Sequence, residues 1–208
     1  MKCNQCPDSC QKNTDASSSL WTGFLPKRFK PKSPEFISQG TIALVGYPNV
    51  GKSLLFNVLT GAYTNVSNYP GTTVEASRNY ITIAGQTIKI IDTPGMYSLT
   101  PMTEEERFSR QLLFEEPLDL AVHVIDAKNL SRMLNFTFQL METQIPILLA
   151  VNMIYEAEKL GVWVNEKQLE ASLGIPVVTL SAAQQRGIKS LTAKMANYVH
   201  TPALSYSY

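Results

Sequence analysis

The chain has 208 residues, of which 44% are apolar and 17% are charged, and its formal net charge is +1. These values fit one soluble domain with a tail, and the near-zero net charge argues against a nucleic-acid partner. The longest apolar run, residues 145–151, is far shorter than the roughly 20 residues of a membrane-spanning helix, and residues 1–19 are too polar for a signal peptide. We therefore expect a cytosolic chain.

Residues 1–40 are predicted to form a flexible tail and a basic, proline-rich linker. The three cysteines of the chain, Cys3, Cys6 and Cys10, all lie within its first ten residues. Their CxxCxxxC spacing suits zinc or an iron–sulfur cluster if a fourth ligand is supplied, whereas an odd number of cysteines argues against a disulfide framework. Free thiols are the alternative to a metal site. For the basic segment, a solvated linker is favoured over a lipid-binding or RNA-binding one.

From Thr41 onward, apolar strand-like runs alternate with helical patterns. The first strand ends at Gly46 and is followed by a helix closed by Gly61, and two alternating segments around Gly85 predict a β-hairpin. Further strand-like runs are LDLAVHVID, IPILLAVN and IPVVTLS, and helical patterns occupy residues 102–115, 129–142, 165–173 and 187–199. This order predicts an α/β domain over residues 41–200, with a mostly parallel sheet of six to seven strands, one antiparallel edge strand and helices on both faces. Residues 201–208 are predicted to be a C-terminal tail.

A glycine-rich loop joins the first strand to the first helix. The run GYPNVGKS matches GxxxxGK[ST] in the strand–loop–helix setting that this phosphate-binding motif requires. Its backbone N–H groups would surround a phosphate at the positive helix N-terminus, Lys52 would reach the outer phosphates, and Ser53 would bind Mg²⁺. The predicted nucleotide-binding residues of this loop are Gly46, Tyr47, Pro48, Asn49, Val50, Gly51, Lys52, Ser53 and Leu54.

The sequence DTPG closes the next parallel strand. Asp92 can hold magnesium there, and the Gly95 N–H can bond to a γ-phosphate and so sense its presence. Between the two motifs lies the polar stretch NVSNYPGTTVE, where Thr72 or Thr73 would close on Mg²⁺ and the γ-phosphate. Met96 stands where many small GTPases carry a water-orienting glutamine, so we expect slow catalysis or help from backbone groups, a cation or a partner.

The predicted base-reading residues follow two later strands. Guanine-nucleotide-binding proteins carry Asn-x-x-Asp after a strand, and the corresponding run here is NMIY, which has Asn152 in place but Tyr155 in the fourth position. Ser181 and Ala182, after the last strand, form the second predicted base contact. Because ligands of open α/β sheets bind beyond the carboxyl ends of the strands, all these motifs are expected to meet at one edge of the sheet.

The order GxPNVGKS, NYPGTT, DTPG, NxxY and SA, together with residues 126–178, resembles the cytoplasmic G domain of the FeoB family of bacterial ferrous iron transporters. The resemblance covers residues 41–199 and implies a translation-factor-like, Ras-like P-loop GTPase fold. It also implies hydrolysis of the β–γ phosphoanhydride bond of GTP, coupled to Fe²⁺ uptake. The residues that it implies are Ser53, Thr73 and Asp92 for Mg²⁺; Asn49, Asn68 and Tyr69 for K⁺; and Lys52, Asn49, Thr73 and Gly95 for catalysis.

The same resemblance implies partners that lie outside this chain. They are a transport domain in the inner membrane, which would hold this domain at the cytoplasmic face, and small Feo accessory proteins. A homo-oligomer is a further alternative. The helical and membrane domains that follow the G domain in the family are not present after Ala182, so we interpret the chain as a fragment or a free-standing paralogue.

Tyr155 departs from the family pattern, in which a carboxylate accepts hydrogen bonds from guanine N1 and N2. Losing that pair should cost roughly 1.5–3 kcal/mol of guanine affinity, whereas adenine would lose much less. The hypothesis is a phosphate site of full strength with a relaxed base reader, which gives weak GTP preference, general NTPase activity that includes ATP, or binding with negligible turnover. Two rival functions are a ribosome-assembly GTPase and a nucleotide-gated adaptor whose cysteines bind metal.

Overall fold

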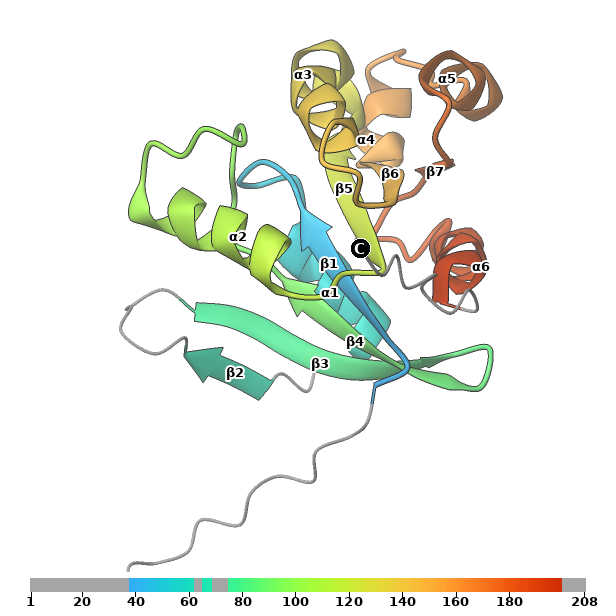
Figure 1. Cartoon of the computed structure of the whole chain (residues 1–208). Helices are drawn as coiled ribbons and strands as arrows, with labels where there is room; N and C mark the ends of the chain where they lie inside the picture. The colour runs from blue at the N-terminus through green and yellow to red at the C-terminus, as the bar shows by residue number, and fades with distance from the viewer. Residues whose placement is uncertain (1–37, 62–64, 69–74, 200–208) are drawn as a thin grey trace, which may run out of the picture. The chain divides into compact units, whose positions relative to one another are not determined.

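The computed structural model describes residues 38–61, 65–68 and 75–199 (Figure 1). Both predicted tails lie outside these ranges, except for residues 38–40, of which Gly40 begins the first strand. The strands are β1 Gly40–Val45, β2 Asn65–Asn68, β3 Glu75–Ile83, β4 Gln86–Asp92, β5 Leu120–Asp126, β6 Ile147–Asn152 and β7 Val177–Thr179. The helices are α1 Lys52–Thr60, α2 Glu104–Glu115, the 3₁₀ turn η1 Ala127–Asn129, α3 Leu130–Met141, α4 Ile154–Lys159, α5 Glu166–Leu173 and α6 Ile188–Val199.

The seven described strands form one sheet in the order β2-β3-β4-β1-β5-β6-β7. Five of them, from β4 to β7 in that order, are mutually parallel, and β3 is antiparallel to both of its neighbours. The predicted α/β fold with a mostly parallel sheet is confirmed. One detail differs: the antiparallel strand is not the edge strand, because β2 pairs outside it. The polar sequence of β2, NVSN, carries no apolar alternation that would have indicated a strand.

The β3–β4 hairpin turns at the predicted glycine. Ile83 pairs with Gln86, which leaves Ala84 and Gly85 as the two central residues of the turn, with φ values of 50° and 82°. Positive φ at both positions is what a two-residue hairpin requires to match the twist of its strands. Gly85 therefore fixes the register of β3 on β4.

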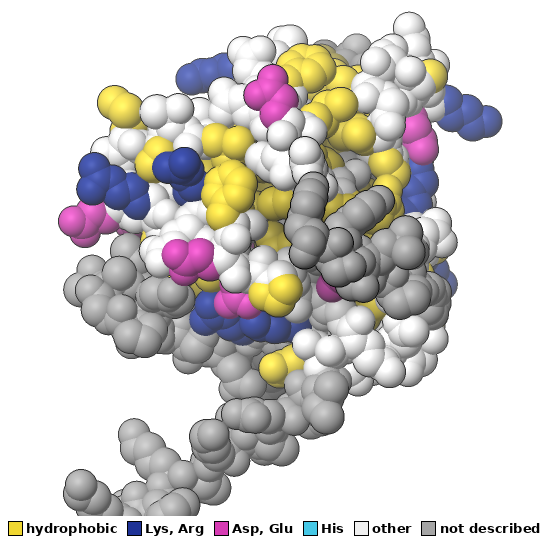
Figure 2. Space-filling model, in the orientation of Figure 1, with side chains coloured by type: hydrophobic (Ala, Val, Ile, Leu, Met, Phe, Trp, Pro, Cys, Tyr) yellow, Lys and Arg dark blue, Asp and Glu magenta, His cyan; other side chains and the backbone are white. Residues whose placement is uncertain are grey.

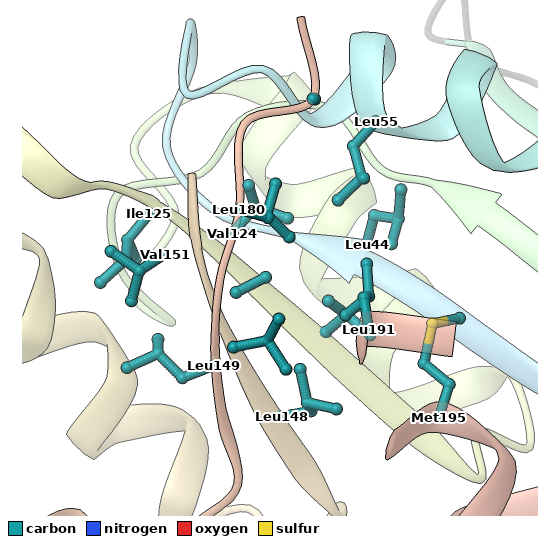
Figure 3. Close-up of a cluster of buried hydrophobic side chains, with 14 of the residues drawn as sticks. Leu44, Leu55, Val124, Ile125, Leu148, Leu149, Val151, Leu180, Leu191 and Met195 are labelled. Carbon is teal, nitrogen blue, oxygen red and sulfur yellow. The ribbon is translucent and has the colours of Figure 1, made fainter. Parts of the chain in front are cut away.

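Helices cover both faces of the sheet, as predicted (Figure 1). In β1, Ile42 and Leu44 face the core that includes α1 and α6, while Ala43 and Val45 face the core that includes α2 and α3. Figure 3 shows the first of these cores between the strands, α1 and α6. Its labelled side chains are Leu44, Leu55, Val124, Ile125, Leu148, Leu149, Val151, Leu180, Leu191 and Met195. Burial of this kind supplies about 1.5–3 kcal/mol for each large aliphatic side chain.

The register of the parallel strands aligns their carboxyl ends. Leu44 of β1 lies opposite Asp92 at the end of β4, and Val45 lies opposite His123 of β5. Asp126, the last residue of β5, lies opposite Asn152, the last residue of β6. The loops that carry the motifs therefore leave the sheet at the same edge.

The displayed surface carries basic and acidic side chains in an interspersed pattern, without a large area of one sign (Figure 2). This agrees with the net charge of +1. Over the described ranges, no helix has the length and apolar content needed to cross a bilayer.

Helix α2 begins with a reciprocal cap directly after the loop that follows β4. The Thr103 hydroxyl accepts a hydrogen bond from the Glu106 backbone N–H at 3.2 Å, and the Glu106 carboxylate accepts one from the Thr103 N–H at 3.3 Å. The same carboxylate accepts from the N–H groups of Met102 and Tyr97. These bonds, led by that from Met102, lower the pKa of Glu106. Glu106 thus holds the loop that precedes α2 as well as the first turn of the helix.

Replacement of Thr103 by alanine should lower the free energy of unfolding by about 1 kcal/mol, because it removes one acceptor of the cap. Urea unfolding of the two proteins measures the difference. Thr100→Ala, which alters an exposed threonine of the same loop, is the matched control and should change the free energy much less. Equal effects of the two substitutions would contradict the capping role.

Candidate functional site

The loop between β1 and α1 passes close to β5. Gly46 has a φ of 145°, and a Cβ at this position would lie 2.2 Å from the carbonyl oxygen of Val124, so only glycine fits. At the other end of the loop, Gly51 precedes α1 without a side-chain hydrogen bond to the first turn. The first N–H groups of α1 are therefore left to bind an anion, which is the arrangement that the phosphate-binding motif predicts.

Lys52 is buried at the base of this loop, with 6% of its surface exposed. Its ammonium group donates a hydrogen bond to the backbone carbonyl of Tyr47 at 2.9 Å. Burial lowers the pKa of Lys52, and the negative charge of Asp92 partly opposes that shift. A neutral carbonyl offsets little of the cost of burying the ammonium charge, so a phosphate group would stabilise Lys52.

Asp92 lies at the carboxyl end of β4 and is 9% exposed. Burial raises its pKa, while a hydrogen bond with the Ser53 side chain and the charge of Lys52 lower it. No described residue pairs with its buried Oδ1 atom. An unpaired carboxylate oxygen beside a hydroxyl is a ligand set that fits Mg²⁺, which prefers oxygen ligands. Ser53 and Asp92 would hold this ion.

The DTPG segment lies against the phosphate loop. A Cβ on Gly95 would come within 2.7 Å of the backbone nitrogen of Pro48, so the close approach of the two loops requires glycine here. The next N–H group, that of Met96, donates to the carbonyl of Gly46 at 3.1 Å. The Met96 side chain is fully buried in the core beside α2 and α3 and therefore is not a water-orienting group.

A row of aromatic rings links these loops to the core. The ring of Tyr97 meets that of Tyr47 edge-on, with centroids 4.8 Å apart. The Tyr47 ring lies 6.3 Å from that of Phe136 in α3, which in turn meets His123 of β5 edge-on at 4.9 Å. Edge-to-face contacts of this kind add about 0.5–1.5 kcal/mol beyond burial. Tyr97 thus anchors the loop after β4 on the phosphate loop.

Asn152 joins the phosphate loop to the loop after β7. Its side-chain nitrogen donates to the carbonyl of Val50 at 2.9 Å, and its side-chain oxygen accepts from the N–H of Ala182 at 3.0 Å. The residue is 1% exposed. Ser181, next to Ala182, is equally buried, and no described residue pairs with its hydroxyl oxygen. The predicted base-contacting residues are therefore brought together with the phosphate loop.

Tyr155 lies in the first turn of the short helix α4, which the sequence patterns did not indicate. The ammonium of Lys159, one turn further along, lies 4.3 Å from the centroid of its ring. Of the two neighbouring carboxylates, Glu158 accepts a hydrogen bond from Arg186 at 2.9 Å, and Glu156 Oε2 is buried without a partner among the described residues. The position that carries a carboxylate in guanine-reading proteins thus carries a phenol beside a cation.

Several predicted site residues lie outside the described ranges: Cys3, Cys6, Cys10, Tyr69, Thr72 and Thr73. Asn68 is described as the last residue of β2, where it pairs with Glu75. Over the described residues, no group of three or more His, Cys, Asp or Glu side chains is placed to hold a metal ion.

His123 is a residue of the site region that sequence reasoning placed only in a core strand. It is fully buried, its Nδ1 lies 3.0 Å from the Thr137 hydroxyl, and its Nε2 has no described partner. Burial, aided by the charge of Lys52, lowers its pKa to about 3. The sequence shows a histidine in a largely apolar strand. It does not show the partners of His123, because these come from residues distant in the chain.

A family model described as ferrous iron transport protein B matches residues 40–195, most of the chain. The chain belongs to this family. The Fe(2+) transporter FeoB of Shigella flexneri is 38% identical over 162 residues, which cover 76% of this chain and 21% of that protein. This chain therefore spans about a fifth of the length of such curated FeoB relatives.

Solved structures of FeoB domains are also similar to this chain. The G domain of T. maritima FeoB matches with a TM-score of 0.72 and 37% identity, over 77% of this chain and 99% of that one. The cytosolic domain of T. maritima FeoB in its GMPPNP form matches with a TM-score of 0.73 and 35% identity, over 81% of this chain and 69% of that one. The described fold is thus a FeoB-type G domain, as the sequence predicted.

The buried His123 should make the stability of this G domain depend on pH. Because its pKa is about 3 in the folded chain and about 6.5 in the unfolded chain, protonation favours unfolding as the pH falls below about 6.5. When the pH falls from 7.5 to 5, the His123 imidazole should lower the free energy of unfolding by about 2 kcal/mol. Urea unfolding at both pH values measures this loss.

His123→Asn is the matched variant, because its amide can still reach Thr137 but does not titrate. Over this pH interval, the free energy of unfolding of His123→Asn should fall by about 2 kcal/mol less than that of the parent. An identical loss in both proteins would show that His123 does not cause the dependence.

Proposed function

We propose that this chain binds and hydrolyses nucleoside triphosphates with Mg²⁺, as the nucleotide-dependent part of a ferrous iron transporter. The observation that carries the proposal is the buried pair of Lys52 and Asp92 beside the N-terminus of α1, which no side chain caps. The unpaired Asp92 oxygen and the partly compensated Lys52 ammonium suit a cation and a phosphate respectively.

In this proposal, Lys52 holds the outer phosphates, and the Gly95 N–H senses the γ-phosphate. Ser53, Asp92 and Thr73 hold Mg²⁺, which neutralises phosphate charge when bound. The contact of Gly95 with Pro48 supports the second assignment, because a Cβ at residue 95 would push the two loops apart.

Potassium is assigned to Asn49, with backbone groups of Asn68 and Tyr69. Asn49 has a φ of 63° in the phosphate loop, a conformation that asparagine tolerates better than most residues. Because the Met96 side chain is buried in the core, no glutamine-like side chain from that position orients the attacking water. A cation near the phosphates would supply the missing stabilisation of developing charge.

The base is assigned to Asn152, Ser181 and Ala182, with relaxed selection because Tyr155 replaces the guanine-reading carboxylate. That the cytosolic domain of T. maritima FeoB has been solved in a GMPPNP form supports nucleotide binding by a domain of this fold. We propose a place at the cytoplasmic face of the inner membrane, joined to a transport domain and contacting small Feo accessory proteins. The chain itself covers only the G-domain part of such a protein.

Hydrolysis of GTP and ATP should proceed faster in potassium buffer than in sodium buffer of equal ionic strength, because K⁺ would fit the Asn49 site. Asn49→Gly removes the amide but still tolerates a positive φ, and it should reduce the potassium rate to the sodium rate. Phosphate release measures the rate of each protein with each nucleotide in each salt.

Lys52→Ala is the control and should lose hydrolysis in both salts while its thermal unfolding remains cooperative. Equal rates of the parent in the two salts would contradict the potassium assignment. Hydrolysis by Lys52→Ala at the parent rate would contradict the phosphate-loop assignment.

A further inference from the structure

The position that reads the guanine edge in other G domains has changed its hydrogen-bonding character in this chain. A carboxylate only accepts hydrogen bonds at neutral pH, whereas the Tyr155 hydroxyl donates as well as accepts. The Lys159 ammonium, 4.3 Å from the Tyr155 ring centroid, adds three further donors and a positive charge. Without a carboxylate at residue 155, the charge of Lys159 is not neutralised within this pair.

The two residues form a built pair rather than a chance contact of long side chains. They are four residues apart in α4, so they lie on the same face of the helix. A cation above a tyrosine ring is attracted by about 0.5–1 kcal/mol at an exposed site. This attraction favours the arrangement in which the ammonium lies over the phenol ring.

Two carboxylates flank this position. Glu158 is engaged by Arg186 at 2.9 Å, and Glu156 Oε2 is buried without a partner among the described residues. On the opposite loop, the Ala182 N–H donates to Asn152 Oδ1 at 3.0 Å. The Ser181 hydroxyl, 1% exposed and without a described partner, remains to contact a ligand.

Guanine and adenine differ in whether they present hydrogen-bond donors or an acceptor to Tyr155 and Lys159. Guanine presents the N1–H and the 2-amino group, which are donors, and adenine in the same orientation presents the bare N1, which is an acceptor. The Tyr155 hydroxyl can still accept from N1–H, but the Lys159 ammonium only donates, so guanine donors that face it stay unpaired and are repelled by its charge. A donor facing N1 forms a hydrogen bond, which the ammonium strengthens.

We infer that Tyr155 and Lys159 are the base-selecting pair of this domain and that they favour adenine nucleotides over guanine nucleotides. This inference rests on the proposed nucleotide binding and specifies its substrate class. Unlike a merely relaxed reader, which would treat the two purines alike, the pair is expected to discriminate against guanine.

The test is calorimetric titration of the whole chain with MgADP and with MgGDP. The parent should bind MgADP more tightly than MgGDP. Tyr155→Asp should shift the ratio of dissociation constants toward GDP by roughly 10- to 100-fold. Tyr155→Phe, which keeps the ring and the cation contact, and Lys159→Met, which keeps the length of the side chain, should each weaken MgADP binding more than MgGDP binding.

Lys167→Met, on the exposed surface of α5, is the matched control and should leave both constants unchanged. A parent that binds MgGDP as tightly as MgADP or tighter overturns the inference, as does an unchanged ratio in both Tyr155→Phe and Lys159→Met. Failure of the proposed function gives a different result: the parent then binds neither nucleotide and is indistinguishable from Lys52→Ala.

Discussion

The side-chain amide of Asn152 is the interaction on which the geometry of the site depends. It leaves the end of β6, donates to Val50 in the phosphate loop and accepts from Ala182 after β7. The parallel register brings these three loops to one edge of the sheet, but packing alone would leave their separations free to vary. Both bonds are buried, so losing either would leave a polar backbone group without a partner, at about 1–3 kcal/mol.

The phosphate side of the site is organised by opposing charges rather than by apolar packing. Burial disfavours the charged forms of both Lys52 and Asp92, and each partly restores the other. A bound phosphate would support the lysine and a bound cation would support the aspartate, so the ligands would supply the opposite charges that each group needs. The contacts Gly95–Pro48 and Tyr97–Tyr47 connect the phosphate loop to the loop after β4.

The sequence predicts the strands of the parallel sheet and the phosphate-loop residues because each rests on a local pattern: apolar runs, or glycines at fixed spacing before a helix. Three features escape that reasoning. Strand β2 is short and polar, and only its pairing with β3 reveals it. Helix α4 has only six residues, too few to show a recognisable helical pattern in the sequence. The contact between Lys159 and Tyr155 therefore could not be predicted. The partners of His123 come from distant elements, which no local pattern encodes.

Urea unfolding of Asn152→Ala without nucleotide tests the bridge most directly, with Asn57→Ala, an exposed site in α1, as the matched control. If the bridge holds the three loops together without a ligand, Asn152→Ala should lose roughly 2–5 kcal/mol and Asn57→Ala should change little. If Asn152→Ala is as stable as the parent without nucleotide and weaker only in nucleotide binding, the side chain acts as a base contact alone, and the bridge does not organise the site.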